Sequence, residues 1–275
     1  MLRKKRAKIV LLFALLYSFA DVNNAQTDCA VKNTVFKQGE KVSYKIYYHW
    51  HFVWLESAQV NFSVSFKNYY GVPSYYMEGN GRTYPKYDWF YKVRDTFQTY
   101  LDTARFSPLR YMRASHEGST NVGNDNVFNM NKQEVYCLSE DKKGHYKQDS
   151  IRIPPCTFDV LSGIYYTRCF NFSNCKLNDT IPLKLYLDGH VYHVHLRYLG
   201  KENVSSSFGK FRCVKFGVSL ISGTMFKEGQ EMTVWATDDA NRLPIYIEAP
   251  IIVGSVRAEL ESFSNLRNPM DAKVK

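Results

Sequence analysis

The sequence predicts a mainly β protein: a strongly curved antiparallel sheet that forms an open or spiral-like barrel, with one short helix around residues 158–170. Two observations support this prediction. Short segments of alternating apolar and polar residues recur along the chain between Gly-, Asp- and Pro-containing turns, and such alternation is typical of strands with one dry and one wet face. Aromatic residues make up 16 % of the chain, and its 21 tyrosines suit half-hydrated sheet surfaces.

The first 25 residues are typical of a secretory signal peptide. Five basic residues between Arg3 and Lys8 precede an apolar run over residues 9–20, which is too short to span a bilayer comfortably. We expect cleavage after Ala25, or less favourably after Ala20, with a retained membrane anchor as the alternative. The mature protein is then periplasmic or otherwise exported and has no stable membrane anchor.

The mature chain divides into three parts. We expect a polar lead-in over residues 26–35, a single β domain over residues 36–265 and a flexible tail over residues 266–275. No repeat of 20–50 residues and no low-complexity linker divides the domain. The signal peptide contributes a net +4 of the formal charge of +10, so about +6 remains. Because Lys and Arg are scattered rather than clustered, we expect no nucleic-acid partner.

The expected strands follow one another along the domain. Gly79 and Gly81 interrupt the third strand, which predicts a bulge or sharp bend there. The ranges are 41–52, 53–66, 74–84, 95–101, 108–117, 126–131 and 133–138 before the helix, and 181–187, 190–199, 210–220, 230–236, 243–248 and 253–263 after it.

The helix over residues 158–170 begins at Thr157 or Asp159, both of which are good N-cap residues. Asp159 and Arg168 bracket it, and we interpret them as its cap and as an exterior or buried ion-pair partner. Gly163 weakens the helix by about 1 kcal/mol relative to alanine. The expected apolar stripe consists of Val160, Leu161, Ile164 and Tyr165.

A hairpin over residues 181–199 follows the helix. Asp188-Gly189 suits a tight two-residue turn, and that loop length determines the register. The expected opposite pairs on the apolar face are Leu187 with His190, Leu185 with Tyr192, Leu183 with Val194 and Ile181 with Leu196. The expected wet face carries Lys184, Tyr186, Val191, His193, His195 and Arg197. The leucine face is expected to contact either the core or a ligand.

Three patterns in the chain resemble one family of exported bacterial proteins. The first is Phe36-x-x-Gly39-Glu40-x-Val42-x-Tyr44-x-Ile46-x-Tyr48, the second is Phe158-Asp159-Val160-Leu161-Ser162-x-x-Tyr165-Tyr166-x-Arg168, and the third runs from Trp235 through Asp238-Asp239, Arg242 and Pro244 to Gly254 and Leu260. Together, and in this order over roughly residues 36–263, they resemble the DUF3108 family, a domain of unknown function. The resemblance implies a signal-bearing envelope protein with a strongly curved sheet, and it transfers no catalytic residue.

Two His-x-His pairs raise the question of a metal site. His49 and His51, like His193 and His195, share a face of their strand, so each pair could reach one ion. Lys184 lies opposite His193, and a cation there disfavours a metal, while His190 points to the other face. We expect surface histidines, no metal and no cofactor.

Six cysteines remain after processing, and six allow fifteen disulfide connectivities. Cys169 and Cys175 are near enough in sequence to close a small loop after the helix, so a bridge between them is possible. Buried free thiols are the alternative. No two cysteines have C-x-x-C spacing, which argues against zinc.

We expect a non-enzymatic envelope protein that binds an apolar ligand, such as a lipid, or a partner's peptide on the concave face of the sheet. The expected ligand-binding residues are Leu183, Leu185, Tyr192, Val194 and Trp235. The sequence does not predict the oligomeric state.

Two alternatives remain open. A hydrolase of envelope glycan or peptide would use the carboxylates near Asp238, Asp239 and Glu259. Asp-Asp-Ala-Asn is also typical of a turn between strands, and we favour the turn. The other alternative is a structural envelope scaffold.

Overall fold

The computed structural model describes residues 31–50, 53–89, 91–140, 145–219, 229–251 and 254–274. The predicted signal peptide, residues 1–25, therefore lies outside the described residues. None of the helices in the described part of the chain has the length and apolar character needed to span a bilayer.

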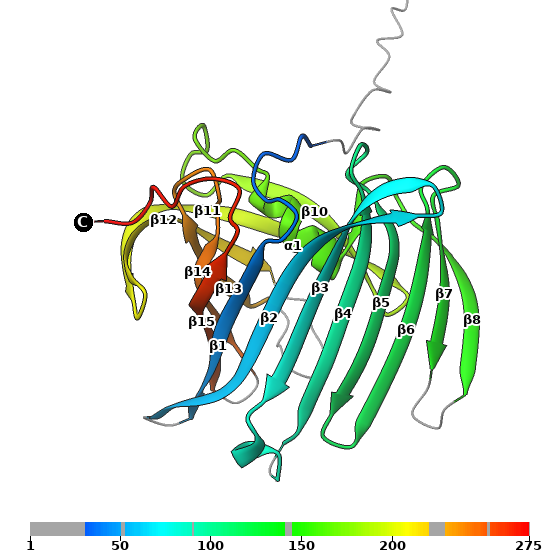
Figure 1. Cartoon of the computed structure of the whole chain (residues 1–275), viewed down its shortest axis with the longest axis horizontal. Coiled ribbons are helices and arrows are strands. Elements are labelled where there is room, and N and C mark those ends of the chain that lie inside the picture. The colour runs from blue at the N-terminus through cyan, green and yellow to red at the C-terminus, as the bar shows by residue number, and fades with distance from the viewer. Residues whose placement is uncertain are drawn as a thin grey trace, which may run out of the picture.

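In the described part of the chain, 15 strands form one curved sheet, so the predicted mainly β class is confirmed (Figure 1). Its strand order is β8-β7-β6-β5-β4-β3-β2-β1-β15-β14-β13-β12-β11-β10-β9. The strands are β1 (Lys41–Trp50), β2 (Val53–Tyr69), β3 (Val72–Thr83), β4 (Val93–Asp102), β5 (Pro108–Glu117), β6 (Thr120–Asn129), β7 (Glu134–Glu140), β8 (Tyr146–Arg152), β9 (Thr157–Asp159), β10 (Thr180–Leu187), β11 (His190–Ser206), β12 (Gly209–Ser219), β13 (Glu231–Thr237), β14 (Pro244–Pro250) and β15 (Ser255–Ser264).

The first and last strands meet in the middle of the sheet, where β1 pairs antiparallel with β15. The sheet therefore consists of two meanders, β1–β8 and β10–β15, and β9 adds a short parallel pair beside β10. A 3-10 turn, η1 (Pro85–Tyr87), lies between β3 and β4. The helix α1 (Val160–Arg168) lies inside the curl (Figure 1). It contacts β3 and β4 from one meander, β10 from the other, and the added strand β9.

Gly163 lets α1 pack closely against β10, and Gly79 lies where β3 faces the helix. A Cβ on Gly163 would lie 2.6 Å from Leu185 Cδ2 on β10, and one on Gly79 of β3 would lie 3.1 Å from the Phe62 ring and 3.8 Å from Leu161 Cδ1. The predicted bulge at Gly79 is wrong, because the β2–β3 and β3–β4 registers run without a shift. Gly79 instead makes room for the Phe62 ring.

The helix begins as predicted, with Asp159 as its N-cap. The carboxylate of Asp159 accepts the backbone N–H groups of Leu161 and Ser162, each at 2.9 Å. Of the predicted apolar stripe, Leu161 and Tyr165 are buried, whereas Ile164 is 40 % exposed. The predicted stripe is wrong at that position. The sheet covers the helix on two sides, which buries small and polar residues of α1, and Ile164 lies on the side that stays open.

The β10–β11 hairpin has the predicted register at all four apolar pairs, including Leu187 with His190 and Leu183 with Val194. The face of the hairpin that was predicted to be wet is only partly exposed to solvent. His193 and His195 are exposed, but Tyr186 is fully buried, because the end of the hairpin packs against β6, where the Tyr186 ring lies 5.6 Å from the ring of Phe128.

The ends of the domain are packed more tightly than predicted. Residues 266–274 are held against β12: the backbone N–H of Arg212 donates to the Ala272 carbonyl at 2.8 Å, and Ala272 is fully buried. Residues 266–274 therefore have specific contacts with the sheet, and the flexibility of this tail stays a prediction. At the other end, Val35 is fully buried in the core, so the polar lead-in ends before the predicted boundary.

The cysteine prediction is also corrected. Cys169 and Cys175 are both free thiols, so the predicted bridge between them is wrong. Cys137 and Cys213 are buried free thiols, as the alternative stated, and Cys156 is disulfide-bonded.

Candidate functional site

Four of the five predicted ligand-binding residues pack beneath the helix. Leu183 and Val194 are 6 % and 3 % exposed and belong to the core around α1, and Leu185 and Tyr192 are half-buried against that core. Since α1 occupies the inner side of the hairpin, these side chains serve the core in this structure.

Trp235 does not lie with these four residues. Its neighbours Val234 and Ala236 are buried in the inner core, which places Trp235 on the outer face of β13. There it pairs in register with Lys215 and Tyr246, and Lys215 Nζ lies 5.0 Å from its ring centre. The expectation that Trp235 lines the concave face is therefore wrong.

The carboxylates considered for hydrolysis each have a local partner. Asp238 forms an ion pair with Lys201 at 2.9 Å, and Glu259 accepts the backbone N–H of Ser207 at 2.6 Å. Asp239 accepts the Thr237 hydroxyl at 2.8 Å within the connection between β13 and β14. This arrangement confirms the turn interpretation of Asp-Asp-Ala-Asn.

The histidines have the neighbours expected of surface residues. His193 lies opposite Lys184, as predicted, and His49 stacks on Trp54 with ring centres 4.4 Å apart, whereas His51 lies outside the described residues. Across the described ranges there is no group of three or more His, Cys, Asp or Glu side chains that could hold a metal.

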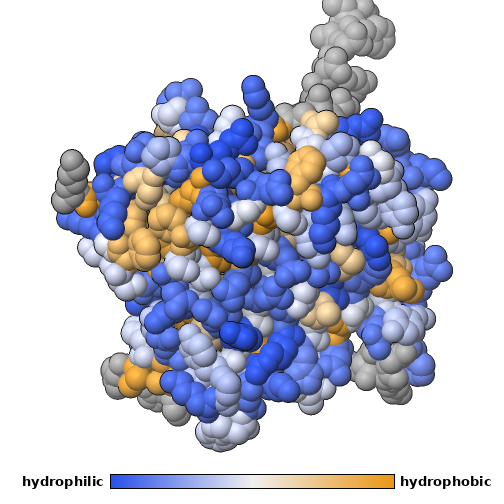
Figure 2. Space-filling view, viewed as in Figure 1, coloured by the Kyte–Doolittle hydropathy of each residue, from blue (hydrophilic) through white to orange (hydrophobic). Residues whose placement is uncertain are grey.

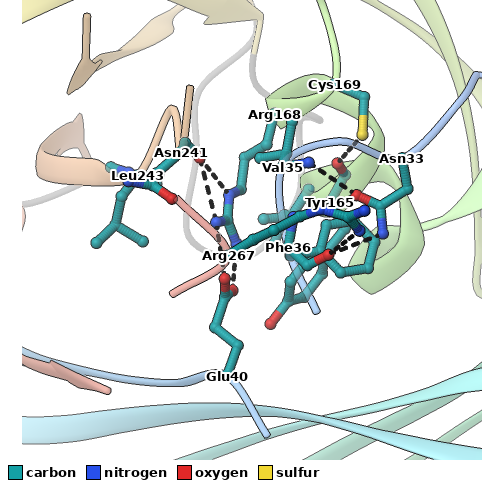
Figure 3. A network of polar contacts seen from close by, with 12 residues as sticks. Asn33, Val35, Phe36, Glu40, Tyr165, Arg168, Cys169, Asn241, Leu243 and Arg267 are labelled. Carbon is teal, nitrogen blue, oxygen red and sulfur yellow. Dashed lines mark hydrogen bonds and ion pairs between the residues drawn. The ribbon is translucent and has the colours of Figure 1, made fainter. Parts of the chain in front are cut away.

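A buried ion pair connects α1 to the start of β1 (Figure 3). Arg168 donates to Glu40 at 2.6 and 3.1 Å and to the backbone carbonyl of Asn241 at 3.2 and 3.3 Å. Burial tends to lower the pKa of Arg168, but the charge and hydrogen bonds of Glu40 outweigh burial and raise it, so the guanidinium stays charged. This confirms Arg168 as an ion-pair partner. Glu40 cannot be recognised as its partner from a local sequence pattern, because 128 residues separate the two.

A second buried polar group surrounds the helix cap. Asp159 is fully buried, and its second carboxylate oxygen accepts the hydroxyls of Thr99 on β4 at 2.8 Å and Ser162 at 2.7 Å. Burial raises the pKa of Asp159, although the hydrogen bonds to its carboxylate oppose the shift. These contacts fasten the start of α1 to the β1–β8 meander, so we interpret them as structural.

The tip of the β10–β11 hairpin connects the two meanders through side chains. Asp188 accepts Asn124 Nδ2 at 2.7 Å and forms an ion pair with Arg113 at 3.2 Å. The Tyr186 hydroxyl donates to Asn126 Oδ1 at 3.1 Å. These side chains, rather than a backbone ladder, join the hairpin to β5 and β6.

Two carboxylates share one hydroxyl on the inner side of β4 and β5. The Ser115 hydroxyl lies 2.5 Å from Asp95 Oδ1 and 3.1 Å from Glu117 Oε1. Burial and the charge of Glu117 raise the pKa of Asp95. Arg113 lies 3.5 Å from Glu117, and a cation so close disfavours a metal. No local sequence pattern indicates that Asp95 would lie beside Ser115 and Glu117.

The edge at β8 is a surface whose backbone groups can still form hydrogen bonds. This strand ends the sheet order and has β7 as its neighbour, and all of its residues except Ile151 are exposed. Beside it lies an apolar group that we call the edge patch. Its members are Val127, Tyr136, Leu138 and Tyr146, which are 38, 36, 42 and 68 % exposed. Figure 2 shows apolar surface where Figure 1 places β7 and β8.

The opposite end of the sheet is closed. All three residues of β9 are buried, and this strand also contacts β5. The described part of the chain therefore has one end strand open to solvent and one end strand covered by protein.

Comparison with known proteins agrees with the fold. Residues 43–261 match the family model described as "Protein of unknown function (DUF3108)". The crystal structure of a β-barrel-like protein of domain of unknown function DUF1849, from Brucella abortus, is similar with a TM-score of 0.55 at 9 % identity, covering 86 % of this chain and 99 % of that one. No curated protein matches. Because the family model spans most of the curved sheet, the chain belongs to the DUF3108 family.

Proposed function

We propose that this DUF3108 protein acts outside the cytoplasm as a non-enzymatic binding protein, and that it receives an extended segment of a partner envelope protein along β8. The observation that carries the proposal is the uncovered end strand: six residues of β8 are exposed, whereas the other end strand, β9, is buried.

An edge strand presents unpaired backbone N–H and C=O groups, which an added strand satisfies. The edge patch lies on the outer face next to this edge and offers apolar contacts to alternate side chains of the added strand. Lys147 and Asp149 lie on the inner face and pair with each other at 3.1 Å. Charges on an edge discourage unselective pairing, so they favour a partner with complementary charges.

This proposal keeps the partner-peptide part of the sequence-based hypothesis and moves it from the concave face to the edge. A lipid on the concave face is less well supported, because α1 and its core cover the hairpin residues that would hold it. A hydrolase is not supported by Asp238, Asp239 and Glu259, since each holds a local structural contact.

Export is the second part of the proposal. It is supported by the basic and apolar segments of residues 1–25 and by the disulfide-bonded Cys156, since disulfides persist in oxidising compartments. N-terminal sequencing of the protein from cell fractions tests it. We expect an envelope fraction whose chain starts at Gln26. An intact Met1 in the cytoplasm would overturn this part.

Site-specific photo-cross-linking in the producing cell tests the edge. A photoreactive residue at Gln148 of β8 is expected to give one discrete adduct with a second protein, and the same residue at Ser262 of β15, in the middle of the sheet, none. Leu138→Glu, which places a charge in the exposed edge patch, is expected to abolish the adduct. Deuterium exchange of β8 amides should slow when the cross-linked segment is added as a peptide.

Three outcomes contradict the proposal. Equal adducts at Gln148 and Ser262 would show unselective contact. An adduct of twice the mass of this chain would mean that a second copy, rather than another protein, covers β8. If the adduct persists in the Leu138→Glu variant and the melting temperature is unchanged, the contact does not depend on the edge patch.

A further inference from the structure

A polar trough crosses the outer face of the β1–β8 meander, away from the edge patch apart from their shared Tyr146. Its volume is about 740 Å³. One wall is a row of residues on six adjacent strands: Asn61, Asn80, Thr96, Ala114, Gly123 and Glu140. The other wall consists of Arg82, Arg94, His116 and Asn121. We call this feature the outer trough. In Figure 2 the surface over β3–β6 is predominantly hydrophilic.

The strand register aligns the first wall across the sheet. Asn80 lies opposite Asn61 and Thr96, and Ala114 lies opposite Thr96 and Gly123. The outer trough therefore runs perpendicular to the strands from β2 to β7. Five strand spacings give it a length of about 24 Å, which suits a chain-like ligand rather than a single small molecule.

Small side chains keep the middle of the outer trough open, and an aromatic ring lies at its end. Ala114 is exposed, and a Cβ on Gly123 would lie 3.1 Å from Glu140 Oε2. Glu140 lies opposite Tyr146 in the β7–β8 register, so Tyr146 continues the row. This ring is 68 % exposed and offers an apolar face with a polar tip.

The walls have unused hydrogen-bonding capacity. Arg94 is held by Asp88 at 2.5 and 3.1 Å, whereas exposed Arg82 has no hydrogen bond or ion pair with any residue that the structure describes. His116 Nδ1 lies 2.5 Å from Asn121 Oδ1, and its other ring nitrogen, Nε2, has no hydrogen-bond partner among the described residues.

These features select one class of ligand. Apolar lipid tails do not suit walls made of amides, hydroxyls and charges, and a nucleic acid needs several free cations, whereas Arg94 is neutralised and Glu140 is acidic. A sugar chain offers donors and acceptors along its whole length and an apolar ring face for Tyr146. The carboxamides of Asn61 and Asn80 each use one acceptor and one donor position within the sheet. The N–H and the oxygen lone pair that remain on each match the C=O and N–H of acetamido groups.

We infer that the outer trough binds an oligosaccharide of N-acetylated amino sugars. The inference does not depend on the proposed partner at β8, because the two surfaces share only Tyr146.

Isothermal titration calorimetry of the mature protein tests the inference with two probes of equal length, the hexamer of N-acetylglucosamine and maltohexaose. The acetylated hexamer is expected to bind at least about tenfold more tightly, a factor that corresponds to about 1.4 kcal/mol. Ala114→Tyr fills the middle of the outer trough and is expected to weaken binding at least about tenfold. Ala114→Ser is the matched control and leaves the outer trough open.

A second variant, Arg82→Ser, removes the free guanidinium and is also expected to weaken binding. Both positions are exposed, so melting temperatures should stay unchanged. No binding of the acetylated hexamer at millimolar concentration overturns the inference. Equal affinity for maltohexaose overturns the choice of sugar, and undiminished binding by a folded Ala114→Tyr variant overturns the location. Leu138→Glu is expected to leave sugar binding intact, which distinguishes this test from that of β8.

Discussion

Glu40→Gln is expected to be one of the most destabilising single substitutions in the domain. Glu40 is 1 % and Arg168 5 % exposed, and the substitution removes the negative charge that faces the Arg168 guanidinium. The amide can still accept one of the two hydrogen bonds, but the buried cation is left unpaired. Breaking a buried pair in this way costs about 3–5 kcal/mol. For a domain of this size, about 2–4 °C per kcal/mol lowers the melting temperature by about 6–20 °C.

Urea unfolding of the mature protein at pH 7, followed by tryptophan fluorescence, measures this loss. The exposed Lys147–Asp149 pair is the matched control, and Asp149→Asn is expected to leave the midpoint unchanged. Combining Glu40→Gln with Arg168→Met should cost less than the sum of the two single changes, because the double variant leaves no unpaired charge. A loss below about 1 kcal/mol for Glu40→Gln, or additive losses, would refute the argument.

Three further predictions concern α1 and the thiols. Gly163→Ala should lower stability by about 1–3 kcal/mol in thermal melts, although alanine favours helices, because its Cβ would lie 2.6 Å from Leu185 Cδ2; an unchanged melting temperature would contradict this packing. Asp159→Asn should retain stability at pH 7 better than Asp159→Ala. Burial raises the pKa of Asp159 in the folded state, so protonation of this group stabilises the fold below about pH 3.8, and this stabilisation is lost as the pH rises through the folded pKa. The urea midpoint of the wild type should therefore fall relative to that of Asp159→Asn between about pH 4 and 8. A gap between the two midpoints that stays constant over this range would refute the argument. Burial raises the pKa of Cys213 to about 12, so a thiol reagent at pH 8 should label it more slowly than half-buried Cys175, and equal rates would argue against this burial.

The parts of the fold that follow from local chemistry are predictable from the sequence. Asp188-Gly189 alone determines the register of a long hairpin, because a two-residue turn leaves one pairing possible. Asp159 is identifiable as the helix cap, since only its side chain and that of Thr157 precede the helix with suitable oxygens. These inferences involve neighbours along the chain.

The errors arise where distant segments meet. Tyr186 belongs to the wet face by alternation, but contact with Phe128 of β6 buries it, and no local pattern indicates that contact. Glu40 resembles a surface residue in its segment and becomes buried through a pair with Arg168. The β8 edge also depends on the strand order, because a strand is an end strand only by virtue of where all the others pair.

The way the interior is filled explains why the sheet retains an edge. A sheet of about 15 strands that closed on itself would surround a lumen too wide for side chains alone to fill. Here α1 lies within the curl and packs on β3 and β4 as well as β10, and Gly163 lets it approach β10 closely. With the helix in place, Asp188 and Tyr186 join the hairpin to β5 and β6 through side chains, and a backbone ladder around the whole barrel is unnecessary. A fully closed barrel has no edge to offer, so the arrangement that fills the interior with a helix also leaves β8 available to the partner that we propose.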